Sequence, residues 1–377
     1  MRYRYSAGPN GKLERKAIIY TNDEHGINLT DVDSDAVSII RRLKSAGFDT
    51  YIVGGAVRDL ILGKKPKDFD IVSAASPTRI KKIFRNSRII GRRFRLVHVY
   101  SGQRIFEVST FRSLKDGHTS NTFGTIEEDV QRRDFTFNAL YYDPEQQIVV
   151  DYVGGMNDIK RKIVKPIISL SEIFTEDPVR MIRAVKYSAA TGFSLPLNIK
   201  MKIAVQSNLL TSISPSRLTE EIFKIINSNN AAVIVDSLDR MGLYNYLQPQ
   251  AALLMRKNLS FRNSYLQSLA DLNNSENQRG KALASLYRDY LDTTKEWKQG
   301  PVDNFKEICK TVRNFVLPMN PPRFELEYSI KKYLAAKGII IKRSLPKPVQ
   351  THEEIKSAVK NKRRRRKPKN KVIETTT

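Results

Sequence analysis

The chain is poor in the side chains that cross-link proteins or bind soft metals. Its 377 residues include one cysteine, Cys309, and four histidines. A single cysteine excludes an intrachain disulfide and fits a reducing compartment, so we expect a cytoplasmic protein. So little cysteine and histidine argues against a zinc site. No stretch approaches the roughly 18 apolar residues of a membrane span, and the charged N-terminus lacks the apolar segment of a signal peptide.

Acidic residues are scarce relative to basic ones. The chain has 39 Asp and Glu against 65 Lys and Arg, which gives a formal charge of +26. This surplus indicates a polyanionic partner, with nucleic acid the first candidate and an anionic membrane surface the second. Residues 342–371 alone contain thirteen Lys and Arg and two acids. Such a run repels itself, so we expect a basic tail at 342–377 that is disordered until it meets a polyanion.

The rest of the chain divides into an α/β part and a helical part. Residues 1–30 are polar and aperiodic, and we expect a flexible arm there. After this arm, capped amphipathic segments predict helices at 33–48, 56–63 and 76–84. Short β-branched or alternating runs predict strands at 50–53, 68–73, 95–101 and 104–111. From about residue 170 onward, helical periodicity dominates.

Two aspartates stand one residue apart in the predicted strand 68–73. Residues i and i+2 of a strand project from the same face, so Asp68 and Asp70 can reach one cation together. Carboxylate oxygens suit Mg²⁺, which completes its shell with water and substrate phosphates. Glu107, a lone acid in an apolar strand pattern, is the candidate third carboxylate of a two-metal site. Taken alone, such a pair is more often part of a turn, and such a glutamate more often faces solvent.

A Gly-Gly turn precedes this acidic pair. Gly54 and Gly55 follow the predicted strand 50–53, and Arg58 lies one turn into the next helix. Glycines let phosphate oxygens approach the backbone, and the helix dipole favours their negative charge. Alone, the turn is more often a packing feature. Next to the acidic pair it indicates nucleotidyl transfer, in which metal ions hold a triphosphate and activate a hydroxyl.

A third cluster lies within residues 127–142. Arginines such as Arg132 and Arg133 can bind phosphates, while Asp134 and Asn138 can bind sugar hydroxyls. The alternative is a charged helix edge above apolar core residues.

A fourth cluster opens the helical part. Asp177, Arg180 and Arg183 are spaced i, i+3 and i+6 in the segment EDPVRMIRA, so they share roughly one helix face. A carboxylate acceptor beside a guanidinium donor can mimic the edge of a base and select a nucleotide without a template. The alternative is a salt-bridged pair on a solvated helix face.

Together these motifs resemble the class II tRNA nucleotidyltransferase and bacterial poly(A) polymerase family. The segments YIVGGAVRDLILGKKPKDFDIV, FEVSTFR, RRDFTFNALYY, DYVGG and EDPVRMIRA stand in the family's order. The resemblance implies an α/β nucleotidyltransferase head of the polymerase β type with a mixed sheet, followed by all-α neck and body domains. It divides the chain into a head at 31–160, a base-recognising neck at 161–230, an RNA-binding body at 231–341 and the basic tail.

The resemblance also implies a role for each candidate residue. Asp68 and Asp70 are implied to bind Mg²⁺, with Glu107 as the third catalytic carboxylate. The implied contacts to the substrate ATP are Gly54, Gly55 and Arg58 at the triphosphate, Arg132, Arg133, Asp134 and Asn138 near the sugar and phosphates, and Asp177, Arg180 and Arg183 at the base. In the tail, the candidate RNA-binding residues are Arg363, Arg364, Arg365, Arg366 and Lys367.

The family contains poly(A) polymerases and CCA-adding enzymes. Segments 88–102, 123–136 and 317–324 resemble the bacterial poly(A) polymerase branch, and the basic tail offers sequence-independent RNA affinity. The prediction is therefore a monomeric enzyme of RNA processing and decay that transfers AMP from ATP to RNA 3′ ends by a two-metal mechanism, releasing pyrophosphate. A CCA-adding enzyme acting on tRNA is the alternative. A non-catalytic RNA-binding protein is the third possibility, and contacts with RNA-decay proteins are left open.

Overall fold

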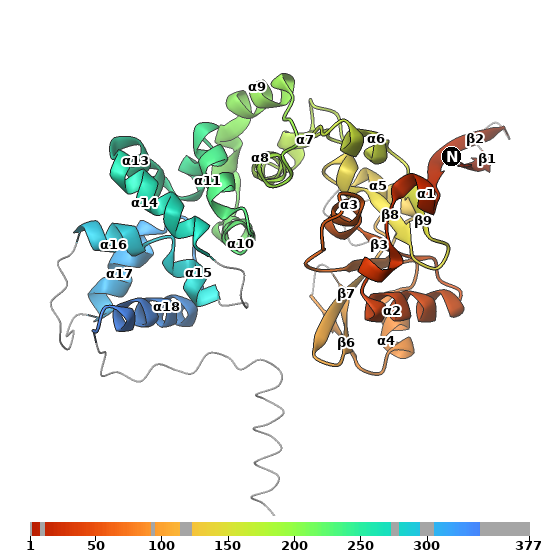
Figure 1. The fold of residues 1–377 in the computed structure, drawn as a ribbon, viewed down its shortest axis with the longest axis horizontal. Helices are drawn as coiled ribbons and strands as arrows, with labels where there is room; N and C mark the ends of the chain where they lie inside the picture. The colour runs from red at the N-terminus through yellow and green to blue at the C-terminus, as the bar shows by residue number, and fades with distance from the viewer. Residues whose placement is uncertain are drawn as a thin grey trace, which may run out of the picture. The chain divides into compact units, whose positions relative to one another are not determined.

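The structure is a computed structural model that describes residues 2–7, 12–91, 95–113, 123–272, 279–294 and 305–339 (Figure 1). The chain divides into two units, the first formed by 1–213 and 236–243 and the second by 214–235 and 244–377. The predicted neck, 161–230, is therefore shared between the two units. The predicted tail at 342–377, with its candidate RNA-binding residues 363–367, lies outside the described residues.

The first unit is built on a mixed sheet. Within the described residues its strand order is β1-β2-β9-β8-β3-β4-β7-β6-β5. The strands are β1 (Arg2–Ala7), β2 (Leu13–Tyr20), β3 (Thr50–Val53), β4 (Asp70–Ser73), β5 (Ser87–Ile90), β6 (Leu96–Ser101), β7 (Arg104–Thr110), β8 (Leu140–Asp143) and β9 (Ile148–Asp151). Neighbours are antiparallel except β4 and β7, which are parallel. The predicted mixed-sheet head is confirmed.

Helices of the first unit pack on this sheet or follow it in the chain. They are α1 (Asn22–His25), α2 (Ser34–Ser45), α3 (Gly55–Ile61), α4 (Pro77–Ile83), α5 (Ile126–Gln131), α6 (Gly155–Lys160), α7 (Ile173–Glu176), α8 (Val179–Thr191) and α9 (Leu197–Gln206), with short 3₁₀ turns η1 (Leu29–Asp31), η2 (Thr136–Asn138) and η3 (Ser207–Ser212). Helix α3 contacts β3 and β8, and α2 contacts β3 and β4. Alternate residues of β3, Tyr51 and Val53, join α5 residue Val130 in one apolar cluster. The central strands are thus packed against α2 and α3 and against the apolar cluster that contains Val130.

The prediction of a loose arm at residues 1–30 was wrong. Strand β2 pairs with β9, and β1 pairs with β2. Ala17 and Tyr20 are buried, because the apolar run 17–20 completes the sheet beside β9. The His25 ring accepts from the Ile27 N–H at Nδ1 (3.0 Å) and lies 3.0 Å from the Gln147 carbonyl oxygen at Nε2. Burial lowers the pKa of His25, which favours the neutral ring with a hydrogen bond at each nitrogen.

The second unit is helical throughout its described residues. Its helices are α10 (Pro215–Ile226), α12 (Tyr244–Leu247), α13 (Pro249–Lys257), α14 (Leu259–Ala270), α15 (Arg279–Ala284), α16 (Arg288–Thr294), α17 (Phe305–Phe315) and α18 (Arg323–Ala336), while α11 (Ala231–Arg240) has residues in both units. Buried polar pairs such as the Tyr244 and Tyr265 hydroxyls, 2.8 Å apart, link helices distant in sequence. The predicted helical body is confirmed, and no described helix has the length and apolarity needed to cross a bilayer.

The segment DYVGG forms a junction between β9 and α6. The Asp151 carboxylate is buried and accepts four backbone N–H groups, from Val153, Gly154, Gly155 and Met156, at 2.8–3.0 Å. A carboxylate at this position satisfies the donors that a helix start leaves free. Asp151 therefore fixes where α6 begins.

Helix α6 in turn holds η2, the turn that carries Asn138. A Cβ atom at Gly155 would lie 2.3 Å from the Thr136 carbonyl oxygen, so the backbones can approach only because residue 155 is glycine. The Thr136 hydroxyl donates to the buried Asp158 carboxylate at 2.7 Å. The junction thus supports the turn that positions Asn138, a candidate site residue.

We expect Asp151→Ala to lower the free energy of unfolding by about 3 kcal/mol, because four backbone donors lose a buried charged acceptor. Asp151→Asn keeps the oxygen that accepts three of these bonds and should lose clearly less. Urea unfolding followed by circular dichroism measures both. Equal losses in the two variants, or a loss below 1 kcal/mol for alanine, would contradict the role given to this carboxylate.

Candidate active site

Two carboxylates are brought side by side by the parallel pair of strands. Asp70 is the first residue of β4, and Glu107 lies within β7. Ile71 is in register with Val108, so the residues before them, Asp70 and Glu107, are also adjacent. Because side chains alternate along a strand, both carboxylates lie on the same face. The structure therefore places Glu107 on the strand next to Asp70, as the sequence led us to expect.

Asp68 is placed differently from the prediction. Strand β4 begins at Asp70, so Asp68 lies in the preceding loop and is not held by strand geometry. Pro66, which lies two residues before Asp68, cannot donate to a strand ladder. Across the described parts of the chain, no group of three or more Asp, Glu, His or Cys is close enough to hold a metal ion. The predicted strand 68–73 therefore starts two residues later than expected, and Asp68 lies outside it.

The two adjacent carboxylates open onto a cavity of about 320 Å³. Three arginines and a third acid join them in its wall. The lining residues are Val53, Asp70, Leu96, Glu107, Ser109, Arg112, Asp129, Arg132 and Arg133. A cavity of this size with convergent charged groups suits a small polar ligand. Carboxylates and guanidinium groups in one cavity suit a ligand that brings phosphate and metal together.

Arg133 is held by a buried tyrosine and a buried aspartate. Its Nη2 donates to Asp129 Oδ2 at 2.9 Å and its Nε to the Tyr141 hydroxyl at 3.0 Å, while that hydroxyl donates to Asp129 at 2.7 Å. Burial raises the pKa of Tyr141 well above its ordinary value, so its hydroxyl keeps its proton. Burial opposes the charge of Arg133, but Tyr141 and Asp129 together raise its pKa. The guanidinium is therefore a fixed cation at the cavity wall.

The other two arginines of the cavity are Arg112 and Arg132. Arg132 Nη1 donates to the Ser113 carbonyl oxygen at 2.6 Å, and the Arg112 backbone N–H donates to Asp129 at 3.3 Å. Burial lowers the pKa of both arginines, and the mutual proximity of Arg112 and Arg132 lowers that of Arg132 further. A phosphate oxygen placed between them would relieve this repulsion.

The Gly-Gly turn and the 132–138 cluster meet at Arg58. Arg58 is buried, and its Nη1 donates to Asn138 Oδ1 at 2.8 Å while Nε and Nη2 donate to Asp59 at 2.9 and 2.7 Å. Gly54 has φ of 74°, a conformation that favours glycine, and a Cβ there would lie 3.9 Å from Arg133 Nη1. Two motifs about eighty residues apart in sequence are therefore joined in space.

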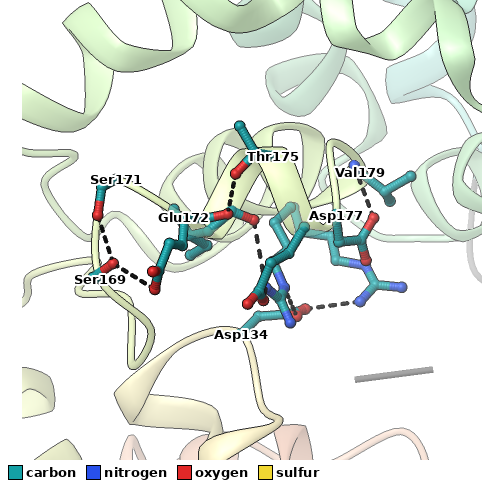
Figure 2. Close-up of polar contacts among 11 residues, drawn as sticks. Asp134, Ser169, Ser171, Glu172, Thr175, Asp177 and Val179 are labelled. Atoms are coloured by element: carbon teal, nitrogen blue, oxygen red, sulfur yellow. Dashed lines mark hydrogen bonds and ion pairs between the residues drawn. The ribbon is translucent and has the colours of Figure 1, made fainter. Parts of the chain in front are cut away.

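Asp134 connects this cluster to helix α8. It accepts from Arg180 Nε at 2.9 Å and from Arg183 Nη1 at 2.7 Å, and Arg180 also donates to Glu176 at 3.0 Å (Figure 2). The Arg180 side chain is almost completely buried. Removing one partner of such a buried pair leaves an uncompensated charge. Arg180 thus ties the start of α8 to the segment that carries Asp134.

Asp177 lies just before α8 rather than within it. Its carboxylate accepts from the Val179 N–H at 3.1 Å, and its backbone is extended, with φ of −145° (Figure 2). The carboxylate therefore caps the helix start, where negative charge is favoured. Arg180 and Arg183 share one face, as predicted, since both bind Asp134.

Two protein-family models match the chain. Residues 50–165 match the family described as "Poly A polymerase head domain", and residues 192–255 match "Probable RNA and SrmB- binding site of polymerase A". The first range contains every residue that lines the cavity. The head is a nucleotidyltransferase domain. The matched segments make the chain similar to bacterial poly(A) polymerases in the head and in part of the helical region, in line with the resemblance seen in the sequence.

Named relatives occur in both branches of the family. Poly(A) polymerase I of Salmonella typhi is 41% identical over 247 residues, which cover 61% of this chain and 53% of the relative. Poly(A) polymerase I of Escherichia coli O157:H7 is 42% identical over 56% of this chain and 49% of its own. The CCA-adding enzyme of Geobacillus kaustophilus is 36% identical over 60% of this chain and 58% of its own. The chain thus spans about half the length of these relatives.

Solved structures agree on the fold. The Bacillus stearothermophilus CCA-adding enzyme in complex with CTP is similar with a TM-score of 0.56 and 27% identity, over 80% of this chain and 82% of that one. A tRNA nucleotidyltransferase complexed with a primer tRNA and an incoming ATP analog has a TM-score of 0.55 at 21% identity. This match covers 86% of this chain and 90% of that one. The second likeness supports the fold alone.

The cavity contains residues that the sequence reasoning did not single out. Asp129 and Tyr141 hold Arg133, and Ser109 and Arg112 line the wall. One signal was available for Asp129, since it stands four residues before Arg133 on a predicted helical segment. Tyr141 had no such signal, because a buried tyrosine in an apolar strand resembles any core residue.

Asp129→Ala should lower the free energy of unfolding by about 3 kcal/mol, because Arg133 and the Tyr141 hydroxyl lose their buried acceptor. Glu127→Ala is a matched control on the same helix, where the side chain is exposed, and should cost less than about 1 kcal/mol. Urea unfolding of the two variants gives the comparison. A loss for Asp129→Ala no larger than that of the control would show that the three-residue contact is not needed for folding.

Proposed function

We propose that the chain is a template-independent RNA nucleotidyltransferase that transfers AMP from ATP to RNA 3′ ends and releases pyrophosphate. The observation that carries this proposal is the pairing of Asp70 with Glu107 at an arginine-lined cavity within the poly A polymerase head. Identity to the named poly(A) polymerases, 41% and 42%, exceeds the 36% to the named CCA-adding enzyme. Adenylate addition is therefore the preferred activity.

The donor set at the cavity fits a divalent cation such as Mg²⁺. Asp70 and Glu107 are adjacent, exposed carboxylates, and Mg²⁺ takes oxygen ligands while keeping positions for water and substrate phosphates. We assign Asp70 and Glu107 as its ligands; Asp68, in the preceding loop, does not complete a group of three with them in this structure. When bound, the metal would neutralise the triphosphate and favour deprotonation of the attacking RNA hydroxyl.

The chain's own cations bind and orient the nucleotide in this proposal. We assign Arg133, which is fixed by Asp129 and Tyr141, and Arg132 to neutralising the phosphates. Preorganised charges of this kind stabilise negative charge that develops in the transition state.

We assign the contacts to the sugar and the base of the nucleotide to the remaining candidate site residues. Arg58 and Asn138, bonded to each other, are assigned to the phosphate and sugar near the Gly-Gly turn. Recognition of the base is assigned to Asp177 and Arg180 at the start of α8, with Arg183 and Asp134 holding that helix against the head. RNA is the macromolecular partner, consistent with the net charge of +26.

CCA addition to tRNA is the second candidate function. The structural similarity to the CCA-adding enzyme in complex with CTP covers 82% of that chain. The sequence matches to the two named poly(A) polymerases cover 53% and 49% of those proteins. Both activities need the same carboxylates and the same phosphate contacts. Only the nucleotide used and the RNA accepted separate them.

Nucleotide use decides between the two candidates. With unstructured RNA and Mg²⁺, we expect ATP to give long adenylate tracts and CTP to give little product. With tRNA that ends before CCA, CTP alone should not add two residues efficiently. Gel analysis of labelled primers reads both outcomes. Efficient addition of two cytidylates to that tRNA would overturn the adenylate assignment in favour of CCA addition.

Asp70→Asn and Glu107→Gln should each reduce AMP addition by about 1000-fold, because the metal's charge stabilisation is worth several kcal/mol. Asp31→Asn, an exposed acid on η1, is the matched control and should keep wild-type activity. Rates are measured with saturating ATP and RNA, and RNA affinity is measured separately without ATP. Near wild-type rates in the Asp70 or Glu107 variant would refute the metal role, whereas no AMP addition by the wild-type chain would favour a non-catalytic RNA-binding protein.

A further inference from the structure

The second unit contains a basic pocket between α17 and α18. Its volume is about 400 Å³. We use the name basic pocket for its lining residues, which are Phe305, Lys306, Cys309, Lys310, Arg313, Arg323, Leu326 and Glu327. All of them lie in the second unit, and none belongs to the nucleotidyltransferase head. The pocket is therefore a feature separate from the candidate active site.

The helical repeat places the cations of α17 on one side. Lys306, Lys310 and Arg313 are spaced i, i+4 and i+7, so they lie on one face of the helix. The apolar residues of the same helix, including Ile308 and Val312, are buried on the other side. Burial of the apolar stripe therefore forces the three cations toward the pocket.

The fourth cation is positioned by the segment 317–324, which resembles poly(A) polymerases. Met319 is fully buried, and the Asn320 backbone N–H donates to the Thr219 hydroxyl at 2.8 Å. Asn320 Oδ1 also accepts from Arg313 Nη1 at 3.2 Å. This anchored segment leads directly into α18, whose first residue is Arg323. The segment thus accepts a hydrogen bond from Arg313 and positions Arg323 at the start of α18.

Positive charge in the basic pocket exceeds negative charge by three. Four cations face one carboxylate, Glu327, which already accepts from Arg323 Nε at 2.6 Å. Lys306 and Lys310 are both exposed, and neither has a carboxylate partner among the described residues. Two ammonium groups four residues apart repel each other unless an anion lies between them. The pocket therefore favours an anionic ligand over a metal ion.

Cys309 does not change this charge balance. Burial, followed by the nearby charge of Glu327, raises the pKa of the thiol to about 11. The thiol is therefore neutral at physiological pH and is a poor nucleophile and metal ligand. Its place at the pocket floor is that of a small apolar residue beside Phe305 and Leu326.

We propose that the basic pocket binds a phosphodiester of single-stranded RNA, with Lys306 and Lys310 neutralising its charge and Arg313 and Arg323 donating hydrogen bonds. Flexible ammonium groups suit sequence-independent backbone contact, whereas a fixed triphosphate site uses preorganised donors. This inference rests on the proposed function, because it supplies an RNA contact outside the head. It gives segment 317–324 a function that adenylate transfer alone does not require.

The test compares K306Q/K310Q with the wild-type full chain in binding a fluorescent oligoadenylate, by anisotropy, over a range of salt. Loss of two phosphate contacts should lower the slope of log affinity against log salt by about 1.4 and weaken binding on the order of tenfold at physiological salt. K306R/K310R keeps both charges and should bind like wild type. K257Q/K332Q removes two exposed lysines of the same unit outside the basic pocket, and it should lower the slope by less than half as much.

Equal slopes in K306Q/K310Q and K257Q/K332Q would overturn the proposal, since only general charge would then matter. Affinities for ATP and for inorganic phosphate are measured in parallel. If these fall as much as RNA affinity in K306Q/K310Q, the pocket is a free-anion site and the proposal is wrong. The binding measurements omit Mg²⁺ and need no AMP transfer. A chain that binds RNA through these lysines but adds no AMP contradicts the proposed function alone.

Discussion

The parallel pairing of β4 with β7 is the constraint on which the candidate site depends. Asp70 and Glu107 are far apart in sequence and come together because Ile71 lies opposite Val108. A slip of one residue would move one carboxylate to the other face of the sheet. Ile71, Val72 and Val108 are fully buried, so such a slip would expose at least part of this core. Packing of the strands therefore sets the geometry of the carboxylates, and the carboxylates add little to folding themselves.

Around this pair, polar contacts connect segments that the chain supplies at different places. Asn138 bonds Arg58, which joins the 132–138 cluster to the Gly-Gly helix, and Asp134 bonds Arg180, which joins the same cluster to α8. Asp151 fixes α6, and α6 supports the turn that carries Asn138. Each contact is buried or partly buried and involves a charge, so each is costly to break and specific in direction. These contacts fix the positions of Arg58 and Arg180 relative to the 132–138 cluster.

Much of the head was predictable because its signals are local. Capped amphipathic helices and short apolar strands at 50–53 and 104–110 follow from spacing alone, whereas the role of each site residue came from the resemblance. The N-terminal strands were missed because charged residues precede the apolar run 17–20, and only pairing with β9 shows why that run is buried. The predicted strand 68–73 began two residues too early, since β4 starts at Asp70 and Asp68 lies in the loop before it. Tyr141 was missed because it meets Asp129 and Arg133 only through tertiary packing.

The central claim is that Asp70 and Glu107 together hold the catalytic metal. Crystals grown with Mn²⁺ and a non-hydrolysable ATP analogue, measured at the manganese absorption edge, test it most directly. The account predicts an anomalous peak within coordination distance of oxygens from both carboxylates and of the triphosphate. A peak bound by other residues, or nucleotide density in the cavity with no metal between Asp70 and Glu107, would contradict it.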